Sequence, residues 1–243
     1  MGLKTKVRTG REAHAGLRIH QSVARQLGIA ILTGVHAPGD SLGGEIDASE
    51  RLGISRTAYR EAIRLLIAKG LIESRPKAGT HVLPRRRWNL LDPDMLAWMF
   101  SERPDESFVR DLFELRGVIE PAAAALAAVR RADGDVVAMT TALVGMRTHG
   151  LGTSAGQAAD QDFHSAILDA AGNAALTSLI GSVGAAVRWT THFKQRITLN
   201  PRDSLPQHEA VYRAIAAGDA DAARTAMVEL LRLARQDVVD IFA

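Results

Sequence analysis

Three residues in the second half of the chain have side chains that bind transition metals. Asp160 and His164, in the segment ADQDFHSAIL, are four residues apart and lie on one face if that segment is helical. His208, in SLPQHEAVYRAI, opens a helical segment much later in the chain. One carboxylate and two imidazoles suit a divalent transition metal and leave coordination positions for water or a ligand. The alternative is two hydrogen-bonded, partly buried histidines and a surface acid, because D-x-x-x-H pairs are common by chance.

The elements that must position these side chains are helices. From Asp94 onward, Ala- and Leu-rich segments with helical spacing are separated by Gly, Pro, Asn and Asp. Asn173 is an expected N-cap, and Gly218-Asp219 is expected to end one helix and begin the next. The predicted helices cover residues 93–102, 105–131, 134–149, 155–171, 173–198, 203–217 and 219–241. Residues 93–243 are therefore expected to form an all-α bundle.

The composition predicts a globular, cytoplasmic protein. Of the 243 residues, 47% are hydrophobic and 23% charged, enough for one large domain or two smaller ones. No apolar run approaches the roughly 18 residues that cross a membrane, and the N-terminus lacks the apolar stretch of a secretory signal. Because there is no cysteine, disulfides, thiol catalysis and thiolate zinc sites are excluded.

The charge is divided unevenly along the chain. Residues 1–87 carry a net charge of +9, whereas residues 88–243 carry −6. A basic segment joined to an acidic one suggests that the first part meets phosphate, although a basic tail and loops without a partner would give the same numbers.

The basic part has the element order of a winged helix-turn-helix. Residues 1–16 are expected to be a disordered basic tail, and residues 85–92 a linker that contributes modestly to phosphate attraction. Between them the pattern predicts helices over 17–34, 45–52 and 56–70, then strands over 71–75 and 80–84 joined by the turn 76–79.

The third of these helices is the expected reader of a DNA major groove. Ser55 is its expected N-cap, and Arg56, Arg60 and Arg64 form one stripe along it. Guanidinium groups and a helix N-terminus suit phosphates and guanine edges. The alternative is an ordinary solvated basic face.

The stretch ASERLGISRTAYREAIRLLIAKGLIESRPKAGTHV resembles the winged helix of GntR-family bacterial transcription regulators. Two departures lie upstream: Leu42-Gly43-Gly44-Glu45 replaces leucine-proline-serine-glutamate, and Ile46 stands where many members carry an arginine that contacts DNA. The residues expected to contact DNA are Ser55, Arg56, Thr57 and Arg60 in the recognition helix and Arg75, Lys77, Gly79 and Thr80 in the wing.

The second half resembles the FCD domain of the FadR-type GntR subgroup, through the stretches FELRGVIEPAAAALAA, DQDFHSAILDAAGNAAL and QHEAVYRAIAAGDADAARTAM. The resemblance implies that Asp160, His164 and His208 bind zinc, nickel or a similar divalent ion. A further family histidine usually follows 22 residues after the one that matches His208. Here that position is Leu230, which implies weaker binding or a greater role for water and effector oxygens.

The same resemblance implies an effector site. Arg116, inside an otherwise apolar helix, would clamp an effector carboxylate, while its alternative is an ordinary ion pair with Glu120. Arg188 is a second candidate for a cavity arginine. His192 could assist the metal or the effector, or be a solvent or cavity-wall residue.

The junction WNLLDPDMLAWMF is similar to that of repressors of D-galactonate and related sugar-acid catabolism. This implies a carboxylate effector such as D-galactonate, with its hydroxyls on polar groups such as Thr191 or Gln195. The resulting hypothesis is a homodimeric transcription regulator, a repressor and not an enzyme, that binds a palindromic operator and leaves it when the effector binds.

Two other classes of function stay open from the residues alone. One is a metal-dependent hydrolase or lyase in which the Asp/His/His cluster activates water, although no nucleophile elbow or phosphate loop accompanies it. The other is an architectural nucleic-acid-binding protein, which would need no cavity.

Overall fold

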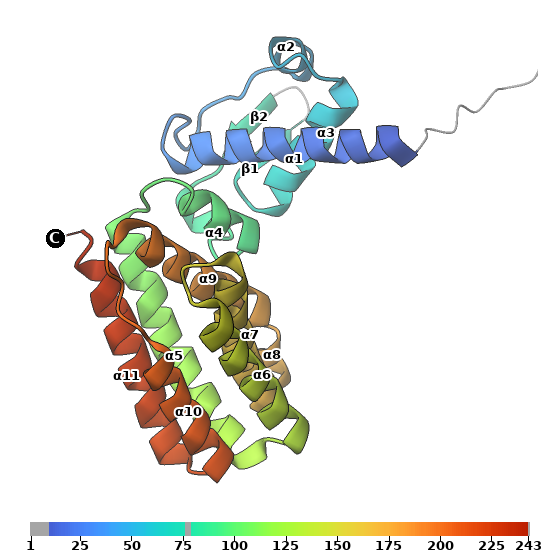
Figure 1. Cartoon of the computed structure of the whole chain (residues 1–243). Helices are drawn as coiled ribbons and strands as arrows, with labels where there is room; N and C mark the ends of the chain where they lie inside the picture. The colour runs from blue at the N-terminus through green and yellow to red at the C-terminus, as the bar shows by residue number, and fades with distance from the viewer. Residues whose placement is uncertain (1–9, 76–78, 243) are drawn as a thin grey trace, which may run out of the picture. The chain divides into compact units, whose positions relative to one another are not determined.

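The computed structural model describes residues 10–75 and 79–242, with side chains from residue 19 onward. The chain divides into two compact units, Met1–Leu90 and Leu91–Ala243, each described below by itself. The division lies within the predicted linker at residues 85–92. The fold class is confirmed: a winged helix-turn-helix precedes an all-helical unit (Figure 1).

The first unit has the predicted order of elements. One difference lies at its start, because the first helix begins at Gly10 and not at Leu17. Residues 10–16, expected in the disordered tail, are therefore helical, and residues 1–9 of that tail lie outside the described residues. The elements are α1 (Gly10–Leu32), α2 (Glu45–Arg51), α3 (Arg56–Ala68), β1 (Ile72–Arg75), β2 (Gly79–Val82) and the 3-10 turn η1 (Arg85–Arg87).

Helix α3 is fixed at its start by the predicted cap and along its length by packing. The Ser55 hydroxyl accepts a hydrogen bond of 3.1 Å from the Ala58 amide, which confirms the N-cap. The helix buries Tyr59, Ala62, Ile63 and Leu66, and it packs against α1 and α2. The antiparallel hairpin that follows pairs Ile72 with Val82 and Arg75 with Gly79.

The expected linker is tied to the first unit over most of its length. Arg85–Arg87 forms a 3-10 turn, the Trp88 indole donates a hydrogen bond of 2.8 Å to the Leu83 carbonyl, and the Asn89 amide donates one of 2.9 Å to the Lys69 carbonyl. Gly70, with a φ of 71°, lies so close to this segment that a Cβ there would be 2.2 Å from the Arg87 carbonyl oxygen. Residues 85–89 are therefore part of the first unit and not a free hinge, because backbone and side-chain groups of this segment are hydrogen-bonded to it.

The second unit is the predicted helical bundle. Asn173 and Asp219 accept the expected capping hydrogen bonds, and Gly218 ends its helix with a φ of 78°. The single helix expected over 173–198 is instead two helices. The first ends at Thr177, the Leu179 amide then donates a hydrogen bond of 2.9 Å to the Leu176 carbonyl in a tighter turn, and the second helix begins at Ile180. The helices are α4 (Pro93–Met99), α5 (Glu106–Arg130), α6 (Asp133–His149), α7 (Ser154–Ala170), α8 (Ala174–Thr177), α9 (Ile180–Ile197), α10 (Leu205–Ala217) and α11 (Ala220–Val239).

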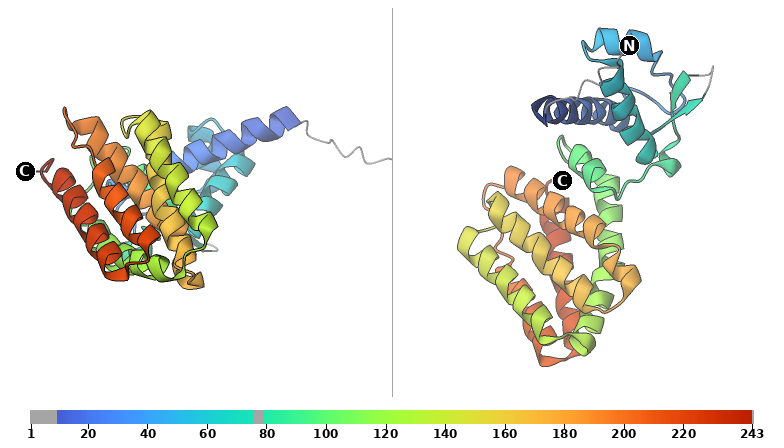
Figure 2. Two further views of the ribbon diagram at one scale, coloured as in Figure 1. Left: turned by 60° about the horizontal axis from the view of Figure 1, so that its bottom comes forward. Right: turned by 90° about the vertical axis from the view of Figure 1, so that its right-hand side faces the viewer.

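Packing in the bundle brings together helices that are distant in the sequence. Helix α5 contacts both α11 and α7, α7 also contacts α6 and α9, and α10 contacts α11 (Figures 1 and 2). The shared core contains many alanines and larger apolar side chains, among them Met139, Phe163, Ile167, Val211 and Leu230. Polar side chains that α5, α7, α9 and α10 direct inward consequently meet in the interior.

Candidate metal and effector site

The three predicted metal ligands come together inside the bundle. Helix α7 supplies Asp160 and His164, and α10 supplies His208. Each is almost fully buried, and one ligand atom from each lies within 4.8 Å of the others. The alternative in which Asp160 is a surface acid is wrong, because α7 turns that face toward α9 and α10.

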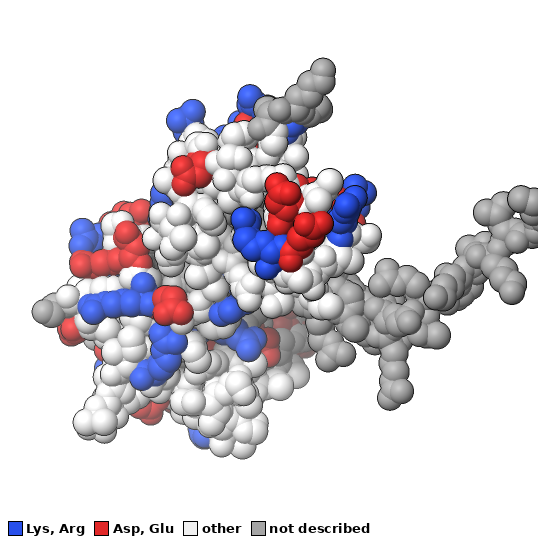
Figure 3. Space-filling model, turned by 90° about the horizontal axis from the view of Figure 1, so that it is seen from above, with Lys and Arg blue, Asp and Glu red and all other residues white. Residues whose placement is uncertain are grey.

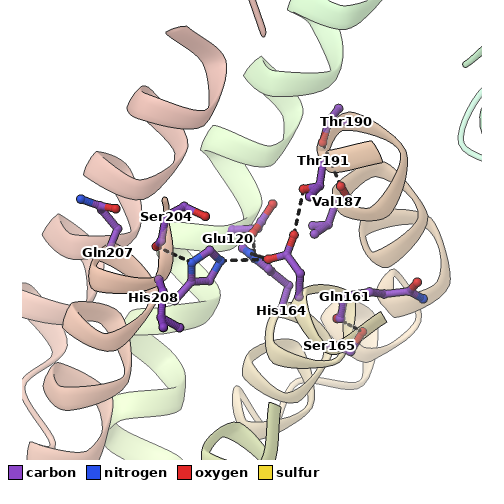
Figure 4. A network of polar contacts seen from close by, with 12 residues as sticks. Glu120, Gln161, His164, Ser165, Val187, Thr190, Thr191, Ser204, Gln207 and His208 are labelled. Carbon is purple, nitrogen blue, oxygen red and sulfur yellow. Dashed lines mark hydrogen bonds and ion pairs between the residues drawn. The ribbon is translucent and has the colours of Figure 1, made fainter. Parts of the chain in front are cut away.

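Both imidazole rings are oriented by a hydrogen bond on their Nδ1 atoms. His164 Nδ1 is hydrogen-bonded to the Glu120 carboxylate, and His208 Nδ1 donates 2.8 Å to the Ser204 carbonyl (Figure 4). Since both partners are oxygen acceptors, each Nδ1 carries the proton, and in the neutral ring Nε2 has the free lone pair. The two Nε2 atoms lie 3.7 and 2.9 Å from Asp160 Oδ1. A carboxylate or carbonyl behind each histidine is the usual arrangement in metal sites.

Two of the ligand atoms have no hydrogen bond. Asp160 Oδ1 and His208 Nε2 are 2.9 Å apart, yet their geometry does not make a hydrogen bond and both are buried. The second oxygen of the same carboxylate, Oδ2, accepts a hydrogen bond of 2.8 Å from the Thr191 hydroxyl. Buried polar atoms are usually satisfied, and a cation beside Oδ1 and both Nε2 atoms would satisfy these. The residues therefore fit a divalent ion.

The carboxylates of the site are held in their charged form. Burial by itself would raise the pKa of Asp160, but the positive charges that His208 and His164 carry in their protonated forms, together with the Thr191 hydroxyl, outweigh it and bring the pKa to about 2. Burial likewise opposes ionisation of Glu120, whereas Arg116 and His164 lower its pKa to about 2. Asp160 is thus an anionic ligand near neutral pH.

Arg116 forms the expected ion pair and also lies at the cavity. Its Nε donates a hydrogen bond of 2.6 Å to Glu120 Oε1, which is the predicted i,i+4 ion pair. Its Nη1 donates one of 3.1 Å to the Thr190 hydroxyl. It also lines the same cavity as the three metal ligands, and its guanidinium stands over the Phe113 ring. The ion pair orients the guanidinium beside the cavity.

The cavity around the triad is small and mixed in character. Its volume is about 30 Å³, room for one or two water molecules but not for a sugar acid. Leu230 lines it, so an apolar side chain stands where the family resemblance expected a further ligand. Besides the triad, the lining includes Phe113, Arg116, Thr190, Thr191, Lys194, Arg202 and Leu230.

Two of the expected effector residues lie elsewhere. Arg188 is exposed, and neither it nor His192 lines the cavity. His192 instead approaches Gln157 with its Nδ1, 3.3 Å from the amide oxygen. The reason is helical spacing: Thr190, Thr191 and Lys194 take the inward side of α9, which turns Arg188 outward.

The sequence reasoning missed four charged groups at or beside this cavity. Glu120 was considered only as a partner of Arg116, and its position in an apolar segment, four residues from that arginine, was the available signal. Lys194 and Arg202 also line the cavity, and Asp237 of α11 binds both. No sequence spacing relates these three, because they come from α9, the α9–α10 loop and α11.

The expected DNA-contacting residues of α3 are exposed. Ser55, Arg56, Thr57 and Arg60 all have exposed side chains, but Arg60 donates 2.8 Å to Glu45 and thereby has a raised pKa. On the face drawn in Figure 3, basic side chains stand beside acidic ones, so the basic charge is interrupted on that face.

The expected DNA-contacting residues of the wing differ in exposure. Arg75 is exposed and pairs with Glu73 at 2.8 Å, and Gly79 is exposed opposite it. Thr80 is buried, with its hydroxyl 3.4 Å from that of Ser74, so its side chain does not face a ligand on the wing surface. Strand alternation explains this, since Thr80 points to the face opposite Gly79. Lys77 lies outside the described residues.

A winged helix-turn-helix followed by an all-helical unit is the architecture of a DNA-binding transcription regulator. Residues 19–82 match the family of bacterial regulatory proteins called gntR, and residues 111–233 match the FCD domain. The chain belongs to the GntR family of transcription regulators, with an FCD domain in its second half.

Two relatives from Escherichia coli K12 extend over nearly the whole chain. The galactonate operon transcriptional repressor is 34% identical over 84% of this chain and 90% of that protein. The HTH-type transcriptional regulator YieP is 33% identical over 86% of this chain and 91% of that protein. A solved structure of Lar, described as controlling the agr system of Listeria monocytogenes, is 17% identical, with a TM-score of 0.62 over 96% of this chain and 98% of that one, which shows the shared fold.

These families consist of transcription regulators and not enzymes, so the hydrolase or lyase alternative is not supported. Among the described residues, none of the helices combines the length and the apolar character needed to cross a membrane.

Proposed function

We propose that this regulator is a homodimeric repressor of a sugar-acid catabolic operon, released from its operator by a carboxylate effector such as D-galactonate. The observation that carries the proposal is the one cavity that Arg116 shares with Asp160, His164 and His208, in a chain 34% identical to the galactonate operon repressor. Because its target is operator DNA, the protein works in the cytoplasm.

The winged unit, residues 17–84, would bind DNA through the exposed start of α3. Arg56 and Thr57 are available for base edges and phosphates, and Arg60 would become available on leaving Glu45. The Ser55–Arg56 end of the helix is its positive end. A two-fold dimer presents two such helices, which is why the expected operator is a palindrome with half-sites about one helical turn apart.

The helical unit, residues 93–243, would bind the effector and form the dimer. Asp160, His164 and His208 would hold a zinc- or nickel-like ion through one oxygen and two Nε2 atoms. Such an ion supplies a cationic centre for carboxylate oxygens and, with three protein ligands, keeps positions free for them. The guanidinium of Arg116 would take the remaining carboxylate oxygen.

The effector acts on DNA binding only if it binds the DNA-competent and DNA-incompetent dimers with different affinity. The test is a fluorescence anisotropy titration of the zinc-loaded protein on its own upstream DNA. We expect saturating D-galactonate to weaken binding at least tenfold. An acid that binds the protein tightly yet leaves the DNA affinity unchanged would overturn the release mechanism.

A second test locates the effector. At 100 times its dissociation constant, a ligand stabilises the folded state by about 2.7 kcal/mol, which shifts the melting temperature by several degrees. We expect D-galactonate to give this shift in wild type but not in Arg116→Lys, which keeps the charge and loses the planar fork. Arg110→Lys, on the exposed side of α5, is the matched control and should respond as wild type does. If Arg116→Lys shows the same melting-temperature shift as wild type, Arg116 does not bind the effector carboxylate.

A further inference from the structure

A second, larger cavity adjoins the one that holds the metal ligands. It has a volume of about 290 Å³ and is lined by Met146, Arg147, Gly150, Leu151, Gln195, Pro201, Arg202, Asp203 and Leu205. The inner cavity, at about 30 Å³, cannot hold a six-carbon acid, whereas ligand pockets usually measure roughly 300–1,000 Å³. The two cavities together reach that range.

Only Leu151 and Arg202 line both cavities among the described residues. These two side chains therefore separate the inner space from the outer one. Leu151 belongs to the short α6–α7 connection, and its carbonyl accepts a hydrogen bond of 3.1 Å from the Gln157 side chain. Arg202 belongs to the longer α9–α10 connection, so its backbone is not fixed by a helix.

Three side chains hold Arg202 in its position between the two cavities. Its Nη2 and Nε lie 2.9 and 3.3 Å from the Asp237 carboxylate, and Nη1 donates 2.8 Å to Gln207. Lys194, almost fully buried, donates 2.7 Å to the same carboxylate and 3.0 Å to the Arg202 carbonyl. Because Lys194 also neutralises Asp237, this carboxylate stays paired when Arg202 moves away.

The chemistry of the outer cavity differs from that of the inner one. The inner cavity offers an arginine and the candidate metal ligands, which suit a carboxylate. The outer cavity offers Gln195, Asp203 and two arginines among apolar side chains, a mixture of donors and acceptors that suits hydroxyl groups.

We propose that the two cavities are the halves of one effector site, in which the outer cavity takes the hydroxylated tail of the acid and Arg202 is the gate and length-determining residue between them. This rests on the proposed function, because it assumes that an acid carboxylate lies at the inner cavity. A three-carbon hydroxy acid extends little beyond the inner cavity and displaces Arg202 less, whereas five- and six-carbon acids require it to leave Asp237.

The test compares D-galactonate with D-glycerate, which carries the same carboxylate and α-hydroxyl on three carbons, on the zinc-loaded full chain. Gln195→Phe, which fills the outer cavity, should weaken D-galactonate at least tenfold in calorimetry and leave D-glycerate within twofold. In stopped-flow measurements, Arg202→Ala should raise the ratio of the D-galactonate to the D-glycerate association rate constant at least fivefold. Arg213→Ala, an exposed arginine on α10, is the matched control and should leave both acids unchanged.

The outcomes separate the gate from the proposed function. Equal effects of Gln195→Phe on both acids, with the variant's melting temperature retained, would overturn the two-part site and leave the effector site standing. An unchanged rate ratio in Arg202→Ala would overturn the gate. If wild type binds D-glycerate but not D-galactonate, the outer cavity takes no tail. If it binds neither, both proposals fail.

Discussion

At the scale of single residues, Glu120 connects the two chemistries of the site. Its Oε1 accepts from Arg116 Nε and its Oε2 from His164 Nδ1, so one carboxylate orients both the guanidinium and a metal-ligating imidazole. It contacts neither the expected metal nor the effector and is a positioning residue.

We predict that Glu120→Gln weakens zinc binding by about 10- to 100-fold. The amide has one oxygen where the carboxylate has two, so its NH2 group must face either the Arg116 or the His164 donor. A competition titration with a chromophoric chelator measures the affinity. Glu114→Gln, exposed on the same helix, should bind zinc as wild type does. Affinity within twofold of wild type in Glu120→Gln would show that the His164 ring is oriented without this carboxylate.

A substitution at Leu230 is expected to strengthen zinc binding instead of weakening it. Leu230 is buried and lines the triad cavity, whereas the adjacent Leu231 is equally buried but does not line it. We predict that Leu230→His tightens zinc binding at least tenfold and reduces the D-galactonate melting shift, because a third imidazole, as the fourth protein ligand, occupies a coordination position. Leu231→His places the same polar group in the core without reaching the cavity. If both variants gain zinc affinity equally, the added histidine is not acting as a ligand at the triad.

At the scale of elements, the winged unit extends through its expected linker. Gly70 lies where α3 ends and closely approaches the carbonyl of Arg87, while Gly53 has a similar positive φ of 64° with nothing near its missing Cβ. Alanine substitutions at the two positions therefore separate the free-energy cost of the backbone conformation from the cost of a steric clash.

We predict that Gly53→Ala lowers the free energy of unfolding of this unit by about 1 kcal/mol, the cost of a left-handed alanine. Gly70→Ala should cost at least about 2 kcal/mol more, because its Cβ would lie 2.2 Å from a backbone oxygen and residues 85–89 must shift. Urea titration followed by far-UV circular dichroism gives both values. Equal losses would mean that the 85–89 segment moves away freely and is a linker after all.

Local signals predicted most of the helices, and three-dimensional packing decided the rest. Caps at Ser55, Asn173 and Asp219 mark helix starts in the sequence, and the D-x-x-x-H spacing placed Asp160 and His164 on one face. The break between α8 and α9 has no proline or cap residue to announce it. Lys194 and Arg202 line the cavity and both bind Asp237, a tertiary contact that no spacing encodes.

At the scale of the whole molecule, the triad joins α7 to α10, two helices separated by α8 and α9 in the chain. We predict that saturating zinc slows hydrogen exchange at least tenfold in α7 and α10 and leaves α1–α3 unchanged, since metal binding stabilises the elements it links. Mass spectrometry of the full chain resolves the segments, and Asp160→Asn is the variant expected to lose the effect. Zinc-dependent protection that persists in Asp160→Asn would place the ion elsewhere.

The charges around the inner cavity balance one another. Arg116, Lys194 and Arg202 stand against Glu120, Asp160 and Asp237 when both imidazoles are neutral. An incoming anion therefore meets no net attraction until a divalent ion adds two positive charges in a setting of low dielectric constant. Under the proposed function, the regulator would respond to the acid only in a cell that also supplies the metal, and metal starvation alone would keep it on its operator with the nutrient present.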